Sequence, residues 1–119
     1  MEAPQASYDQ VFSHQRLDAY RVALEFAGLA HGIVPRVPTG RSALREQLLH
    51  AAESVVQNIA EGAAQVSTPM AKKHYRIALG SAAECSAVLD LLAAYGVGRL
   101  GEGQQLIGRA GAMLRRLAR

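Results

Sequence analysis

Two segments, 54–62 and 77–84, place small and polar residues inside stretches that are otherwise typical of buried helices. They limit the possible folds more than any other feature of the chain. In the first segment, Ser54, Asn58 and Glu61 recur every three or four residues, so they share one stripe of a helix. A helix carries such a stripe when it packs closely on another helix and satisfies a few buried polar groups there. The pattern therefore predicts two helices in close contact.

The second segment supplies the matching surface. Ser81 and Glu84 share a stripe, and Gly80 lies beside Ser81. We expect Gly80 and Ser81 to allow a close approach of the two helices. Hydrogen bonds between the helices are expected from Ser54, Asn58 and Glu84.

Apolar residues recur at helical spacing along four stretches, and turn signals separate them. Alanine supplies much of the apolar content, which favours helices and close contacts between them. The first expected helix runs from about Arg16 to Pro35, and the second from a Thr39 cap to about Gln65. The third begins at a Ser67 cap, with Pro69 at its first position, and ends at Gly96 and Gly98. The fourth runs from beyond Gly103 to the end of the chain.

The first of these helices has a broad apolar surface. Its main line is expected to face the core, and a second line widens the stripe. The main line consists of Leu17, Tyr20, Leu24, Ala27, His31 and Val34, and the second of Ala23, Phe26, Ala30 and Ile33.

No stretch shows sustained alternation with a period of two, so no strand is expected. Short connections favour antiparallel neighbours. The sequence therefore predicts an all-α protein, an antiparallel up-down-up-down four-helix bundle, with a flexible tail over 1–12 and a single domain over 13–119. A turn near Ser67 would place Ser54 beside Gly80 and Asn58 beside Arg76.

The chain has 119 residues, a formal net charge of +3 and a single cysteine. One cysteine excludes an intramolecular disulfide and a thiolate metal cluster. No signal peptide and no membrane-spanning run is evident, so we expect a cytoplasmic protein without a membrane partner. The slight excess of basic residues is compatible with nucleic acid but does not require it.

Two motifs stand in order on the expected second and third helices. Ser54 precedes Asn58-Ile59-Ala60-Glu61-Gly62, and Ala78-Leu79-Gly80-Ser81-Ala82-Ala83-Glu84 follows. At these residues the chain resembles the four-helix-bundle proteins encoded in intervening sequences of bacterial 23S ribosomal RNA genes. The stretch from Phe12 through Leu17 to Tyr20 is similar to the aromatic-leucine entry of that family's first helix, although the family's early tryptophan is missing.

The resemblance implies an up-down bundle that often assembles into a homopentamer. It also implies a relation to the accessory variability protein of diversity-generating retroelements, which binds nucleic acid and a reverse transcriptase. No activity is established for most members. The last helix is rich in glycine here, so we carry no residue over from the family's last helix.

Candidates for catalysis or metal binding have simpler structural explanations. Glu46, His50 and Glu53 form a series on the second helix, but bundle metal sites need such residues from several helices. His31 and His74 cannot be shown to converge on them. We therefore expect no metal and no cofactor, with His31 in the core or at an interface.

Cys85 and Glu61 likewise favour structural roles. Cys85 lies on the buried line of the third helix and is expected to act as a small, inert hydrophobic residue. Glu61 is expected to be buried at least in part, and a buried charge needs a partner. Arg76 is the partner that its position suggests. The sequence therefore predicts that the protein is not an enzyme.

Basic residues gather in three groups that could contact phosphates, whereas aromatic side chains able to stack on bases are few. The leading hypothesis is therefore electrostatic binding of RNA or DNA by basic helix ends repeated in an oligomer. The alternative is a protein-protein scaffold or accessory subunit, for example of a reverse transcriptase. The candidate contacts are Arg41 and Arg45; Lys72, Lys73 and Arg76; and Arg109, Arg115 and Arg116.

Overall fold

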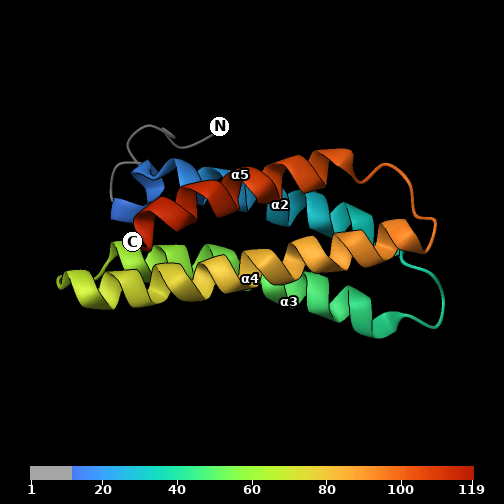
Figure 1. The fold of residues 1–119 in the computed structure, drawn as a ribbon, viewed down its shortest axis with the longest axis horizontal. Helices are drawn as coiled ribbons and strands as arrows, with labels where there is room; N and C mark the ends of the chain where they lie inside the picture. The colour runs from blue at the N-terminus through green and yellow to red at the C-terminus, as the bar shows by residue number, and fades with distance from the viewer. Residues whose placement is uncertain (1–11) are drawn as a thin grey trace, which may run out of the picture.

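The computed structural model describes residues 12–119, which fold into four long helices without a strand in that range (Figure 1). Of the tail expected over 1–12, only Phe12 lies among the described residues. The elements are η1 (Ser13–Arg16), α2 (Asp18–Ile33), η2 (Val34–Arg36), α3 (Ser42–Ala63), α4 (Thr68–Ala94) and α5 (Gly101–Leu117).

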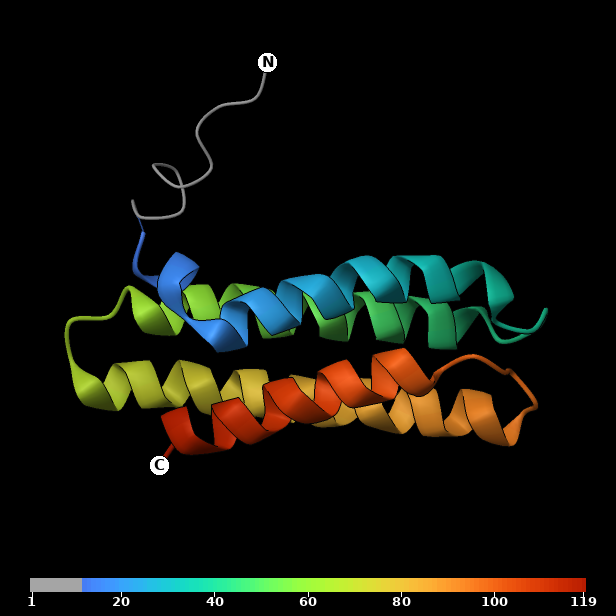
Figure 2. The ribbon, with the colours of Figure 1, turned by 90° about the horizontal axis from the view of Figure 1, so that it is seen from above.

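The helices stand at the corners of a square, and each packs on the two helices beside it. The contacts join α2 with α3, α3 with α4, α4 with α5 and α5 with α2. Figures 1 and 2 together show that successive helices run in opposite directions. The predicted up-down-up-down bundle is therefore confirmed.

The bundle has two different ends. The short turn between α3 and α4 lies at one end, together with the start of α2 and the end of α5 (Figure 1). We call this the α3–α4 end. The connections 34–41 and 95–100 lie at the other end, which we call the loop end.

The face of α2 that packs into the core is not the expected one. Phe26 and Ile33 are each 1% exposed, whereas Leu24 is 51% exposed and His31 is exposed as well. The second apolar line, which contains Phe26 and Ile33, thus forms the core. The prediction that the line with Leu24 and His31 faces the core is wrong. The buried face carries Val22, Phe26 and Ile33 with alanines between them, and none of its side chains is polar.

The start of α4 confirms one predicted cap, and the start of α3 corrects another. The backbone N–H of Met70 donates to Ser67 Oγ at 3.3 Å, as expected, and Pro69 is the second residue of the helix rather than the first. By contrast, α3 begins at Ser42 after Arg41, and Thr39 does not cap it. Gly40 adopts a φ of +90°, so the chain turns there and cannot begin a helix.

The end of α4 follows the prediction, and the start of α5 differs from it. Gly96 has a φ of +90°; its N–H donates to Ala93 O at 3.0 Å, and the N–H of Val97 donates to Leu92 O at 3.0 Å. This pair of bonds is the Schellman arrangement that ends many helices at a glycine. Helix α5 already begins at Gly101, so Gly103 lies inside its first turn.

By length and composition, α4 is apolar enough to cross a membrane, a test that core helices of soluble bundles also pass. In this chain α4 packs on α3 and α5 and contributes buried residues to a compact globule. Only 33% of its most apolar window is buried within the bundle, however. Apolar surface of α4 therefore remains exposed, including Ile77 and Leu91, each 42% exposed.

Candidate nucleic-acid interface

A chain of polar side chains joins α3 to α4, as the sequence predicts. Ser54 Oγ lies 2.7 Å from Ser81 Oγ across the interface. Asn58 Nδ2 donates to the backbone oxygen of Ser54 at 3.0 Å and to Ser54 Oγ at 3.2 Å. Because Ser54 Oγ accepts from Asn58, its own hydrogen is available to donate to Ser81. Ser54, Asn58 and Ser81 therefore hold the two helices in register.

The chain continues to His74, which takes the place expected for Arg76. His74 Nδ1 lies 3.2 Å from Asn58 Oδ1 and 3.2 Å from Glu61 Oε2. Both oxygens are acceptors, so this nitrogen carries a hydrogen that faces them. The side chain of His74 is 16% exposed and that of Glu61 is 61% exposed. The expected burial of Glu61 and its pairing with Arg76 are therefore wrong.

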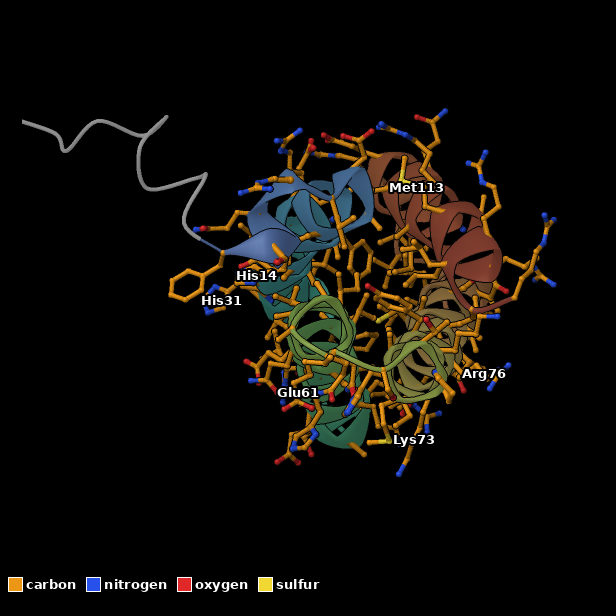
Figure 3. The ribbon with its side chains drawn as sticks, turned by 90° about the vertical axis from the view of Figure 1, so that its left-hand side faces the viewer. His14, His31, Glu61, Lys73, Arg76 and Met113 are labelled. Carbon is orange, nitrogen blue, oxygen red and sulfur yellow. The ribbon has the colours of Figure 1, made fainter. Side chains whose placement is uncertain are left out.

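Helix geometry explains why His74, and not Arg76, contacts Glu61. Arg76 follows His74 by two residues, which turns its side chain about 200° around the helix axis. The stripe that contains His74 faces α3, so Arg76 is exposed on the outside of α4. Figure 3, which views the α3–α4 end, shows Arg76 and Glu61 on different sides of the bundle.

The close approach of α3 and α4 occurs at Gly62 and not at Gly80. A Cβ atom added to Gly62 would lie 2.7 Å from Cε1 of Tyr75, whereas one added to Gly80 would meet nothing within 4 Å. Gly80 is exposed and shares its outer stripe with Glu84. Glu84 is exposed too, and it makes no hydrogen bond with another described residue. The expected interhelical roles of Gly80 and Glu84 are therefore wrong.

Charge is distributed very unevenly along the bundle. Eight of the thirteen basic residues lie at the α3–α4 end, where the described chain has two acidic residues, Asp18 and Glu61. Lys73 and Arg76 project outward from α4 in Figure 3. We call the eight residues the basic end: Arg16, Arg21, Lys72, Lys73, Arg76, Arg115, Arg116 and Arg119.

The remaining candidates do not belong to this surface. Arg41 and Arg45 lie at the start of α3, at the loop end. The guanidinium of Arg41 sits 4.9 Å from the ring centroid of Tyr95. Arg109 lies at the middle of α5. The predicted set is therefore divided between opposite ends of the bundle.

The chain also matches a known protein family. The model of the family named 23S rRNA-intervening sequence protein matches residues 15–119. The chain belongs to this family. No curated protein matches it.

Three positions in the segment 58–62 have structural roles in this chain. Asn58 and Glu61 bind His74, and Gly62 accommodates the ring of Tyr75. His74 and Tyr75 were not anticipated as partners. Ser54 meets Ser81, Asn58 meets His74 and Gly62 meets Tyr75, so no single turn centre would have placed all three pairs.

The groups considered for catalysis or metal binding are dispersed. Cys85 is fully buried, and burial, aided by Glu84, raises the pKa of its thiol to about 12. The thiol is therefore protonated near neutral pH, and the burial expected for Cys85 is confirmed, while its inertness stays a prediction. Among residues 12–119, no three His, Cys, Asp or Glu side chains are placed to hold a metal ion. His50 is exposed on α3, and His31 on α2 (Figure 3).

Proposed function

We propose that the protein is a non-catalytic, cytoplasmic homo-oligomer that binds RNA or DNA electrostatically through its basic end. The observation that carries this proposal is the charge separation, because one end of the bundle gathers eight basic residues against two acidic ones among residues 12–119. Such a concentrated field attracts polyanions more strongly than the net charge of +3 suggests.

Five side chains of the basic end are available to phosphates. Arg76, Arg115 and Arg116 are exposed and form no ion pair with another described residue, and the same holds for Lys73. Lys72 is half-buried and likewise unpaired within the described chain. These side chains come from α4 and α5, which pack side by side. Their long cationic chains suit phosphate contacts and carry no sequence preference by themselves.

Self-association would multiply this surface. The apolar side chains of Ile77 and Leu91 are exposed on α4, so burying them against a second copy would be favourable. Repeating the basic end around a ring raises avidity without adding a contact to any one copy. Five copies is the number that the resemblance implies.

Fluorescence anisotropy with a random DNA duplex tests the proposal. We expect Arg115→Glu combined with Arg116→Glu to abolish binding at about 50 mM salt. If about four phosphates are engaged, wild-type binding should weaken with a log-log salt slope of about −3.6. The matched control, Arg41→Glu with Arg45→Glu, reverses two charges at the loop end and should retain most of the affinity. Salt-insensitive binding, or equal losses in both double variants, would contradict the proposal.

A second candidate function, a scaffold or accessory subunit for another protein, is favoured by a groove between α4 and α5. Its volume is about 300 Å³, and its lining is mostly small residues with Arg115 at one end. A helix of a partner protein can approach closely over such a surface. A pull-down that recovers a stoichiometric protein partner after nuclease treatment would support this function over the first.

A further inference from the structure

The two connections at the loop end line an open surface cavity of about 520 Å³. Two of its lining residues carry a guanidinium and none carries a carboxylate, so its electrostatic character favours an anion. The cavity lies at the opposite end of the bundle from the basic end. Its lining consists of Arg36, Pro38, Tyr95, Gly96, Val97, Gly98 and Arg99.

Arg36 is held in a fixed position in this cavity. Its Nη1 donates to the backbone oxygen of Gly98, and its Nη2 donates to that of Arg99 at 3.1 Å. A guanidinium has five N–H groups, so three remain for a ligand after these two bonds. Because the protein already orients the side chain, a ligand would lose little by ordering it further.

Arg99 occupies a position where a glycine would be expected. Its φ is 58°, and the other two residues with positive φ between 12 and 119 are Gly40 and Gly96. Glycine adopts this conformation without steric cost, whereas other residues do so rarely. An arginine kept in a strained conformation, in a connection otherwise rich in glycine, indicates that its side chain is useful there.

Tyr95 adds an aromatic surface to the two cations. It lines the cavity, is 45% exposed, and has the guanidinium of Arg41 4.9 Å from its ring centroid. An exposed tyrosine ring is a surface on which a nucleobase can stack. We propose that this cavity binds a mononucleotide, with its phosphate held by Arg36 and Arg99 and its base against Tyr95. The site is independent of nucleic-acid binding at the basic end.

Amide NMR of the full chain, titrated with adenosine 5′-monophosphate, tests this proposal. We expect saturable shifts at Gly96 and Gly98, and no such shifts with adenosine, which lacks the phosphate. Arg99→Gly is the decisive variant, because glycine accepts the backbone conformation and the chain should still fold. It should weaken nucleotide binding at least about tenfold, since a charge-assisted contact is lost. Arg45→Ala, at the same end but outside the cavity, is the control and should bind as wild type does.

Three results would overturn the proposal. The first is the absence of saturable shifts at Gly96 and Gly98 up to about 10 mM nucleotide, and the second is equal affinity in the Arg99→Gly variant. The third is the loss of these shifts in the Arg115→Glu, Arg116→Glu variant, which would show that the phosphate binds at the basic end. If the proposed nucleic-acid binding at the basic end fails, the nucleotide-induced shifts at Gly96 and Gly98 should still occur. Failure of one proposal can therefore be distinguished from failure of the other.

Discussion

Single residues at the α3–α4 interface have roles that their chemical type alone does not reveal. Two glycines occur in the segments with small and polar residues, yet only Gly62 lies under a neighbouring ring. Similarly, His74 and Arg76 are both candidates to pair with Glu61, but only His74 lies on the stripe that faces α3. Which of two similar residues matters is decided by its angle around the helix, and small errors in register reverse the answer.

The two glycines should respond oppositely to alanine. Gly62→Ala should destabilise the fold by about 1–3 kcal/mol, because the new Cβ would overlap the buried ring of Tyr75. Gly80→Ala should stabilise it by about 0.5–1 kcal/mol, because alanine is favoured in an exposed helix interior. Urea unfolding followed by circular dichroism measures both, and equal effects would show that Gly62 is not in close contact.

The buried thiol of Cys85 should be protected from alkylation in the folded protein. Burial raises its pKa to about 12, so the reactive thiolate is scarce at pH 8.5 and the sulfur is also inaccessible. We expect native protein to react with iodoacetamide at least about 100-fold more slowly than protein unfolded in urea. Mass spectrometry of timed samples measures this ratio. Fast labelling of the native protein would show that α4 is not packed as described.

The four helices were predictable as elements because their apolar spacing is strong and their connections are short. The exceptions have local causes. Thr39 has the chemistry of a cap, but the positive φ of Gly40 delays α3 until Ser42. On α2, two apolar lines compete, and a single helix does not show which of them the bundle will bury. Caps with an unambiguous context, such as Ser67 before Pro69, were predicted correctly.

The two hydroxyl residues considered as caps should therefore differ in their contribution to stability. Ser67→Ala should destabilise the fold by about 1 kcal/mol, because the N–H of Met70 loses its acceptor. Thr39→Ala should change stability by less than about 0.5 kcal/mol, since Thr39 is exposed and caps no helix. Thermal unfolding of both variants, read against wild type, tests the assignment. A larger loss for Thr39→Ala would reverse it.

At the scale of the whole molecule, the up-down order of the helices was predictable, but which basic residues gather at one end of the bundle was not. Antiparallel order brings the start of α4 and the end of α5 to one end, so Lys72 and Arg115 share a surface although they are far apart in sequence. The same order sends Arg41 to the other end. Counting basic residues along the chain could not separate these groups, because only the directions of the helices decide which end each group occupies.

The concentration of positive charge at one end also sets an orientation. Because most of the unpaired positive charge lies at the basic end, a polyanion bound there would meet the end of the bundle, with the helix axes directed away from it. The arginine cavity would point away from the strand in every copy, open to small molecules from the surrounding solution.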